Sequence, residues 1–342
     1  MKILVTGGTG YIGSHTVVEL LNNDHEVVIV DNLSNSHASV IDQIVKITKK
    51  RPVFEEFDLA DERATRDFFH RHTDIVGVIH FAAYKAVGES VKEPLKYYRN
   101  NLTSLMNILQ NMKDHGIKHL VFSSSCTVYG QPEILPVSEN APTQMAISPY
   151  GNTKQIAEEI IQDTSQVSNI HAVLLRYFNP IGAHETALIG ELPIGIPNNL
   201  VPFITQTAIG LRKELSVFGN DYQTPDGTAI RDYIHVVDLA KAHVIAIDRM
   251  IQGQQKKKVE VFNLGTGRGY SVLEVIQSFE KVSGQKLNYI IVDRREGDIE
   301  KVFSDTKFAN QELGWMALKS LDEMMLSAWK WELKLSDIVN NK

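Results

Sequence analysis

Short apolar, β-branched runs alternate with amphipathic segments through the first half of the chain. The runs predicted as strands cover residues 2–6, 26–30, 53–57, 78–81, 120–123 and 172–177. Segments of helical length, such as residues 14–22 and 61–72, lie between them. Continuous apolar strands between amphipathic helices are buried on both faces. The pattern therefore predicts an α/β fold built on a doubly wound parallel sheet.

The pattern changes after about Asn179. Residues 182–202 hold several glycines and prolines in a long irregular passage, of a kind that is usually functional inside a compact domain. Beyond it, residues 231–242 and 259–267 again have strand–helix and strand–loop patterns. We expect a first domain over residues 1–180, to which segments around 231–267 return, and a smaller mixed α/β domain over residues 181–342.

Composition narrows the class of protein. The 342 residues are 43% hydrophobic and 22% charged, close to globular averages, which excludes a disordered or collagen-like chain. A formal net charge of -6 argues against a nucleic-acid partner. Cys126 is the single cysteine, so we expect no internal disulfide and no metal site built on cysteine. The N-terminal apolar run is too short for a signal peptide, and no run reaches ~18 apolar residues. We expect a cytoplasmic protein that does not contact membranes.

A glycine-rich segment follows the first predicted strand and opens a helix. Residues 7–13 read Gly-Gly-Thr-Gly-Tyr-Ile-Gly, a spacing that lets the backbone approach a pyrophosphate at a helix N-terminus. Asp31 ends the second strand, where a carboxylate can accept hydrogen bonds from the adenosine ribose. Because an acid there disfavours a 2′-phosphate and Asn32 is not an arginine, we expect a Rossmann-type domain that binds NAD rather than NADP. An ordinary tight turn is the alternative.

A tyrosine and a lysine lie four residues apart after a helix-starting pair. Ser148 and Pro149 have N-cap and N1 character, so Tyr150 and Lys154 should share one face of the helix that follows. The ammonium, the helix dipole and a nearby nicotinium ring would each favour phenolate, which predicts Tyr150 as a general base. Ser125, just past a strand, is placed to hydrogen-bond a substrate hydroxyl. An ordinary surface pair is the alternative for the tyrosine and lysine.

Together the glycine turn, Ser125 and the Tyr150–Lys154 spacing resemble the extended short-chain dehydrogenase/reductase family. Nearly the whole chain is similar to its UDP-hexose 4-epimerases, through residues 5–15, 31–36, 80–83, 85–90, 122–130, 175–183, 195–200, 218–222, 231–235 and 294–298. The resemblance implies that Tyr150 takes the proton of the sugar 4-hydroxyl while hydride passes from C4 to tightly bound NAD. The 4-keto sugar then turns over and hydride returns, so NAD is regenerated each cycle. It also implies assistance from Ser125 and Lys154, and a homodimer.

The resemblance further implies two sets of ligand contacts. For NAD these are Gly7, Gly10, Tyr11, Ile12, Gly13, Asp31, Asn32, Asn35, Ser36, Asp58, Leu59, Phe81, Ala82, Lys85, Asn100, Ser125, Tyr150, Lys154, Tyr177 and Phe178. For the UDP-sugar they are Asn179, Asn199, Leu200, Phe218, Arg231, Tyr233, Arg295, Asp298 and Val302. Arg231 and Arg295 can form forked, charge-assisted hydrogen bonds to a diphosphate. The first domain would thus bind NAD and the second the UDP-sugar.

One position departs from relatives that are strict for non-acetylated sugars. Those relatives carry a bulky tyrosine where this chain has Val302. A smaller side chain leaves room at the C2 substituent, so we expect UDP-N-acetylglucosamine and its galacto epimer to be accepted as well. The alternative is that neighbouring side chains fill the gap.

Two rival functions stay open at the level of sequence. Nucleotide-sugar 4,6-dehydratases of the same fold carry an Asp-Glu pair after the Ser/Thr, where this chain has Cys126 and Thr127. A non-catalytic NAD-binding regulator has no need of Tyr150, Lys154 and Ser125 together. Both features favour the epimerase hypothesis.

Overall fold

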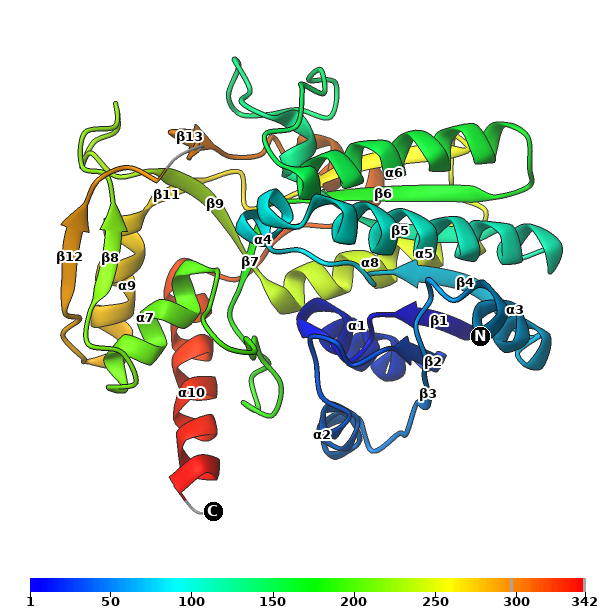
Figure 1. Cartoon of the computed structure of the whole chain (residues 1–342), viewed down its shortest axis with the longest axis horizontal. Coiled ribbons are helices and arrows are strands. Elements are labelled where there is room, and N and C mark those ends of the chain that lie inside the picture. Colours follow the sequence, from blue (N-terminus) through cyan, green and yellow to red (C-terminus); the bar gives the residue numbers. More distant parts are fainter. Residues whose placement is uncertain (296–297, 341–342) are drawn as a thin grey trace.

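The computed structural model describes residues 1–295 and 298–340. In this part of the chain, a parallel sheet runs in the order β10-β6-β5-β4-β1-β2-β3 (Figure 1). The sheet is built from β1 (Lys2–Thr6), β2 (Glu26–Asp31), β3 (Val53–Glu56), β4 (Ile75–His80), β5 (His119–Ser125), β6 (His171–Tyr177) and β10 (Val259–Leu264). The strand order reverses between β1 and β4, which opens a binding crevice at their carboxyl ends.

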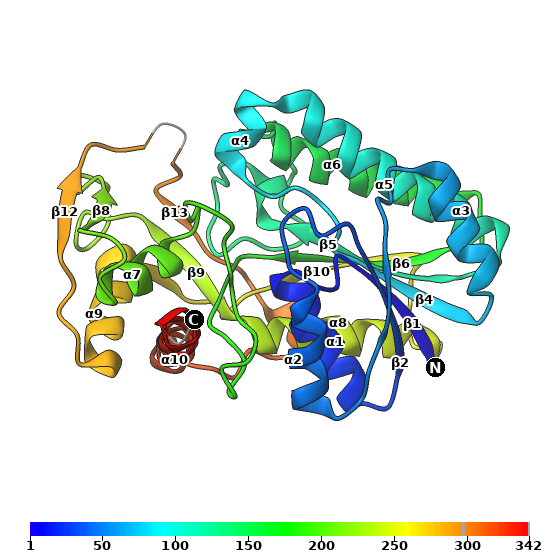
Figure 2. The ribbon, with the colours of Figure 1, turned by 60° about the horizontal axis from the view of Figure 1, so that its bottom comes forward.

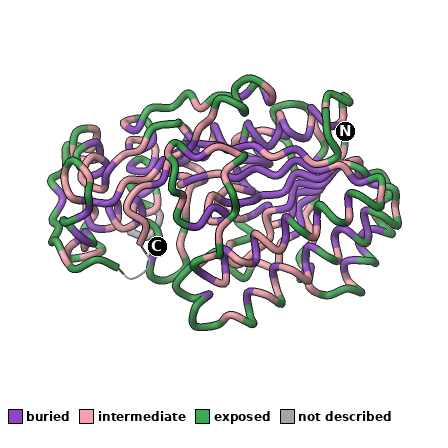
Figure 3. Tube along the Cα trace, turned by 90° about the horizontal axis from the view of Figure 1, so that it is seen from above, coloured by how far each residue is buried: buried purple, intermediate pink, exposed green. Residues whose placement is uncertain are grey.

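Helices cover both faces of this sheet (Figure 2). One face packs against α1 (Tyr11–Asn22), α2 (Ser39–Thr48) and α8 (Val236–Ile251), and the other against α3 (Glu62–Arg71), α5 (Pro94–Asp114) and α6 (Pro149–Gln166). The short α4 (Val87–Lys92) packs on α5 and α6. In β1, Ile3 and Val5 join the first cluster and Leu4 joins the second. Figure 3 shows these strands as a buried layer, and the predicted doubly wound sheet is confirmed.

Several predicted boundaries differ from the structure by one or two residues, and Ser125, expected just past a strand, is the last residue of β5. Two larger differences involve glycine. β4 begins at Ile75 rather than residue 78, because Gly77 interrupts the apolar pattern without interrupting the strand. A Cβ at Gly77 would lie 2.7 Å from Ile247 Cδ1, so the glycine admits the close approach of α8. Helix α1 begins at Tyr11 rather than residue 14, because Gly10 is its N-cap.

A smaller part of the molecule lies beside the carboxyl ends of the sheet (Figure 2). It contains a sheet of β7 (Asn179–Ile181), β9 (Ile230–His235), β11 (Gly269–Ser271) and β13 (Lys301–Val302), and a parallel pair of β8 (Leu215–Phe218) and β12 (Tyr289–Val292). Its helices α7 (Leu200–Ala208), α9 (Val272–Ser283) and α10 (Leu321–Asn340) share one apolar cluster. A short 3-10 helix, η1 (Cys126–Tyr129), and a short π-helix, η2 (Ala309–Leu313), complete the described elements.

The chain crosses between the two parts more than once. Helix α8 and strand β10 pack within the large sheet's layers, whereas β9 pairs with β7, β11 and β13. The limits 1–180 and 181–342 stay a prediction, and residues 341–342 of the second range lie outside the described residues. Within the described residues, no helix has the length and apolar character needed to cross a membrane.

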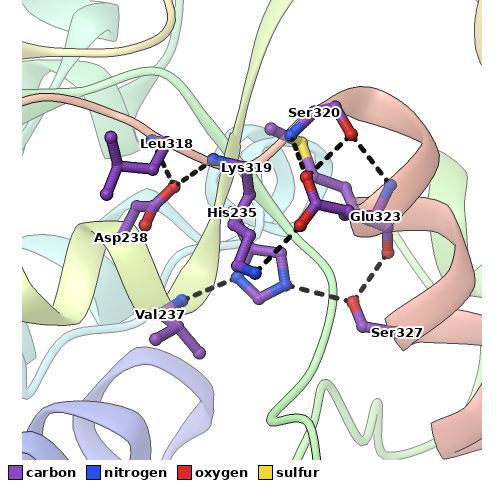
Figure 4. Close-up of polar contacts among 9 residues, drawn as sticks. His235, Val237, Asp238, Leu318, Lys319, Ser320, Glu323 and Ser327 are labelled. Carbon is purple, nitrogen blue, oxygen red and sulfur yellow. Dashed lines mark hydrogen bonds and ion pairs between the residues drawn. The ribbon is translucent and has the colours of Figure 1, made fainter.

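Polar contacts at the end of β9 anchor the C-terminal helix (Figure 4). His235 Nδ1 accepts a hydrogen bond from Val237 N (3.1 Å), and its Nε2 lies 3.1 Å from Ser327 Oγ on α10. One carboxylate oxygen of Asp238 accepts hydrogen bonds from Leu318 N and Lys319 N, both at 2.9 Å. Burial lowers the pKa of His235 to about 4, so the ring is neutral at neutral pH.

Asp232 fixes β9 from within. Its carboxylate is fully buried and accepts hydrogen bonds from Thr266 N (2.8 Å), Thr266 Oγ1 (2.7 Å), Gly267 N (3.2 Å), Ser304 N (3.1 Å) and Ser304 Oγ (2.5 Å). These donors lie in the loop after β10 and the segment after β13. Asp232 therefore holds two distant segments around β9.

Replacing Asp232 with alanine should lower the free energy of unfolding by about 3 kcal/mol or more, because several buried donors lose their acceptor. Urea denaturation measures this. Asp61→Ala is the control, since that side chain caps α3 through one hydrogen bond to Ala64 N and its loss should cost about 1 kcal/mol. Equal small losses in both variants would show that Asp232 does not hold these segments.

Candidate functional site

The glycine turn after β1 leaves its backbone open to contact with a ligand. Gly7 has φ +67°, and a Cβ there would lie 2.9 Å from Ala82 N. A Cβ at Gly13 would lie 2.2 Å from Gly7 O. Gly10 precedes Tyr11 and Ile12 as the N-cap of α1, and no side chain caps its first N–H groups. The turn is a cradle of backbone at a positive helix end, which fits a pyrophosphate.

Asp31 organises the neighbouring loop. Its Oδ2 accepts a hydrogen bond from Thr9 N (3.2 Å), and its Oδ1 accepts from Leu33 N (2.9 Å) and Ser36 Oγ (3.2 Å). Thr9 Oγ1 and Ser36 Oγ lie 2.7 Å apart. The acid at the end of β2 is thus joined to the glycine turn, in the place expected for an adenosine ribose.

Further predicted NAD contacts lie just after the carboxyl ends of β2, β3 and β4. Asn32 Nδ2 donates to Asp58 Oδ2 (3.2 Å), next to the buried Leu59, and Asn35 is exposed in the loop after β2. Phe81 and Ala82 directly follow β4 beside Gly7.

The predicted NAD contacts Lys85, Asn100 and Tyr11 lie nearer the smaller part of the molecule. Lys85 Nζ lies 6.0 Å from the ring centroid of Tyr11, and Asn100 Nδ2 donates to Asn101 Oδ1 (2.9 Å). Tyr11 OH donates to Gly182 O at 2.6 Å, which connects the start of α1 to the chain that leaves β7.

Tyr150 lies buried at the start of α6. Ser148 caps this helix by accepting a hydrogen bond from Gly151 N (3.1 Å), which confirms the predicted helix start. The side chain of Tyr150 lies beside that of Ser125, the last residue of β5, closely enough for the hydroxyl to act on the phenol. Burial, and secondarily Tyr177, raises the pKa of Tyr150 well above its usual range, while the Ser125 hydroxyl acts in the opposite direction. The phenol is therefore protonated in this site at neutral pH.

Lys154 lies one turn further along α6, but its strongest contact is not the phenol. Its Nζ donates to Ser123 O at 2.6 Å and lies 4.8 Å from the ring centroid of Phe122. Burial lowers the pKa of Lys154 to about 8, against the opposing charge of Glu158. The sequence led us to expect the ammonium beside the phenol, where it would favour phenolate. In the structure the ammonium is bonded to β5 instead. In the described residues no hydrogen bond joins Lys154 to Tyr150, because the long side chain reaches the strand.

Tyr177 and Phe178 lie at the end of β6. Tyr177 OH lies 2.6 Å from Ser123 Oγ, and burial raises the pKa of Tyr177 to about 12. Phe178 is buried in a cluster with Tyr129 and donates its N–H to Leu264 O (3.1 Å). Ser123, which sequence reasoning missed, thus contacts both Lys154 and Tyr177. It stands in a run of three serines, and only the strand register shows which of them faces which partner.

The predicted substrate residues gather in the smaller part. Arg295 Nη2 donates to Asp298 Oδ1 (2.7 Å), and Arg231 Nη2 lies 3.7 Å from the same oxygen. Arg295 also lies over the ring of Phe218, 5.6 Å from its centroid. Residues 296 and 297 of the segment 294–298 lie outside the described residues. The two arginines thus converge on one point, and converging guanidinium groups can bind a diphosphate.

The other substrate residues lie on elements around this pair. Asn179 is the register neighbour of the buried Tyr233, and Val302 is that of Arg231. Val302 is 5% exposed and packs in a cluster with Val128, Tyr129, Val137 and Phe178.

Glu191 was also missed by sequence reasoning. Asn199 Nδ2, just before Leu200 at the start of α7, donates to Glu191 Oε1 (2.6 Å), and Lys85 Nζ donates to the same oxygen (3.3 Å). The acid lies in an irregular loop, where no periodic pattern marks it. It joins a predicted NAD contact to a predicted substrate contact. No group of three or more His, Cys, Asp or Glu side chains in the described part of the chain is arranged to hold a metal.

Gly7→Ala should weaken NAD binding by at least about tenfold, because its Cβ meets Ala82 in addition to the left-handed strain of about 1–2 kcal/mol. NAD released from the purified, denatured protein measures the effect. Gly116→Ala is the matched control, since Gly116 has φ +69° and an open surrounding. If both variants retain the same amount of NAD, the cradle is not the binding site.

Comparison with known proteins adds an independent line of evidence. The family model described as "NAD dependent epimerase/dehydratase family" matches residues 3–265. A UDP-glucose 4-epimerase of Bacillus subtilis is 52% identical over 97% of each chain. The crystal structure of a UDP-glucose 4-epimerase from Stenotrophomonas maltophila, with bound NAD and formylated UDP-arabinopyranose, superposes with a TM-score of 0.95 at 48% identity and covers 99% of both chains. That of a Bifidobacterium longum UDP-glucose 4-epimerase, in complex with NAD+ and UDP, gives 0.94 at 47% identity and covers 98% of this chain and 99% of its own. These matches show that this chain belongs to the NAD dependent epimerase/dehydratase family.

Proposed function

We propose that this chain interconverts UDP-glucose and UDP-galactose by epimerisation at C4, with NAD as a tightly bound cofactor. The observation that carries the proposal is the buried placement of Tyr150 beside Ser125, where α6 begins and β5 ends. The relatives matched over nearly their full length bear the name of this activity. Bound NAD would accept hydride from the sugar C4 and return it to the opposite face.

The proton chemistry falls to Tyr150 and Ser125. The sugar 4-hydroxyl must lose its proton as C4 is oxidised and regain one as the alcohol re-forms. Tyr150 is the acceptor and donor of this proton, and the neighbouring Ser125 hydroxyl would assist the transfer. Since burial holds the Tyr150 pKa above its usual range, the phenol becomes a base only when positive charge lies beside it. The charged nicotinamide of oxidised NAD is the cation that meets this condition.

The substrate diphosphate would bind at Arg231 and Arg295. Both guanidinium groups contact Asp298 in the present structure, so the site already gathers an anion at this point. A diphosphate offers more acceptor oxygens and more charge than one carboxylate. Asn199, Leu200, Phe218, Tyr233 and Asn179 surround this site and would contact the rest of the nucleotide sugar.

A 4,6-dehydratase is less well supported by the site. Elimination of water needs an acid and a base beside the sugar, at the positions of Cys126 and Thr127. Burial raises the pKa of the Cys126 thiol to about 12, so it does not exchange protons readily at neutral pH.

We propose, from the family resemblance, that the chain is a cytoplasmic homodimer.

Purified protein given UDP-galactose and no added cofactor should form UDP-glucose, and Tyr150→Phe should lower kcat by roughly a thousandfold because the proton acceptor is lost. Chromatography of the product sugar measures both. Tyr98→Phe, which alters a hydroxyl bonded to Asn152, is the control and should stay active. A 4-keto-6-deoxy product would replace the proposal with the dehydratase, and unchanged substrate would replace it with a non-catalytic regulator.

The smaller side chain at Val302 leads us to propose that UDP-N-acetylgalactosamine is also a substrate. Its turnover should lie within about 200-fold of that of UDP-galactose, since a tolerated substituent changes binding by only about 1–3 kcal/mol. Val302→Tyr should remove the acetylated activity and spare the other. No turnover of the acetylated sugar by the unaltered protein would show that Tyr129 and Phe178 already fill the space.

A further inference from the structure

A buried ion pair lies beneath the candidate site, and the mechanism above does not use it. Glu158 on α6 and Arg176 on β6 are 3% and 6% exposed. Arg176 Nε donates to Glu158 Oε1 (3.0 Å) and its Nη2 donates to Oε2 (2.6 Å). Ser124 Oγ also donates to Oε1, at 2.5 Å. The carboxylate is thus bound from both neighbouring strands.

Each member of this group is adjacent to a residue of the proposed site. Ser124 precedes Ser125, Arg176 precedes Tyr177, and Glu158 lies one helical turn beyond Lys154. Ser124 and Arg176 are direct partners in the β5–β6 register. The carboxylate therefore joins α6 to the ends of both strands at the level where Ser125 and Tyr150 meet.

A third N–H of the guanidinium extends this network. Arg176 Nη1 donates to Tyr129 OH (3.0 Å), and Tyr129 OH donates to Asn263 Oδ1 on β10 (2.7 Å). Such a buried network of several bonds restricts the movement of its members. A buried ion pair is weak evidence for added stability, because desolvation of both charges offsets their attraction. Its position therefore calls for another explanation than stability.

The charges around Lys154 supply that explanation. On β5, Ser123 O and the Phe122 ring face the ammonium. On β4, His80 is neutral, because burial and then Lys154 lower its pKa to about 3. The raised pKa values of Tyr150 and Tyr177 keep both phenols neutral, and the Arg176 cation is paired with Glu158. Glu158 is the group that raises the Lys154 pKa against the effect of burial.

We propose that Glu158 is a positioning residue for the reaction, which keeps Lys154 cationic and, with Arg176, holds Ser124 and hence Ser125 against α6. This inference rests on the proposed function. A cationic Lys154 offers three N–H donors, of which Ser123 O takes one, so two stay available to a bound ligand. Without the carboxylate, the ammonium would lose its proton at lower pH.

The test compares kcat against pH for the unaltered protein and Glu158→Gln, with UDP-galactose as substrate. Lysine labelled with 13C at Cε, whose Lys154 signal is identified by its loss in Lys154→Met, reports the protonation of Lys154 directly by NMR. Lys154 is charged below its pKa and neutral above it. Removal of Glu158 should therefore move both the alkaline fall of kcat and the NMR midpoint to lower pH, by about one unit. KM for UDP-galactose should change little.

A second buried pair provides the matched control. Arg249 Nε donates to Glu260 Oε2 (2.9 Å) and Nη2 to Oε1 (3.2 Å), between α8 and β10 and away from Lys154. Glu260→Gln should lower the melting temperature as Glu158→Gln does, but leave the pH profile and the Lys154 midpoint unchanged. If Glu158→Gln does not fold, Glu158→Gln/Arg176→Met removes both charges and should move the midpoint in the same direction by a smaller amount, because the repulsion from Arg176 is lost as well.

The outcomes separate the two proposals. A Lys154 midpoint that is the same in the unaltered protein and in the Glu158 variant overturns the role of Glu158, even if UDP-galactose is epimerised. A midpoint that falls in the variant of a protein that does not epimerise UDP-galactose supports the role of Glu158 and overturns the proposed function.

Discussion

Removal of the Tyr150 phenol from water is the constraint on which the rest of the site depends. Burial makes the phenolate costly, and among the described residues the neighbouring Ser125 side chain acts against that cost without cancelling it. A tyrosine so placed is inert until a cation lies beside it. The same burial would make the proton transfer depend on the oxidation state of the cofactor, since only oxidised NAD carries the charge. Proton and hydride would then move together.

The fold satisfies this constraint by separating a rigid frame from the residues that meet the substrate. Tyr150, Lys154 and Ser125 stand on α6 and β5, which pack into the large sheet and are tied by Glu158, Arg176 and Ser124. The predicted sugar-binding residues lie on the smaller part, joined to the frame through Tyr11–Gly182 and Lys85–Glu191. Substrates can then differ through side chains of the smaller part while the proton-transfer geometry stays fixed.

Local and periodic features could be predicted from the sequence. The parallel sheet followed from continuous apolar strands, and the start of α6 followed from Ser148 and Pro149, because both depend on neighbours in the chain. The start of β4 could not be predicted, because Gly77 interrupts its apolar pattern. A glycine is needed there only because Ile247, distant in the sequence, packs against it. The partner of Lys154 at Ser123, the Glu158–Arg176 pair and Glu191 escaped prediction because each depends on contacts between distant segments. The resemblance supplied the NAD and UDP-sugar residues, whose roles stay predictions.

The most direct measurement is the protonation of Tyr150 itself. The ultraviolet difference spectrum of tyrosinate, recorded against pH and referred to Tyr150→Phe, isolates this one phenol. The account predicts that Tyr150 titrates near neutral pH when the bound cofactor is oxidised and only at strongly alkaline pH when it is reduced. The same titration in both states would contradict it.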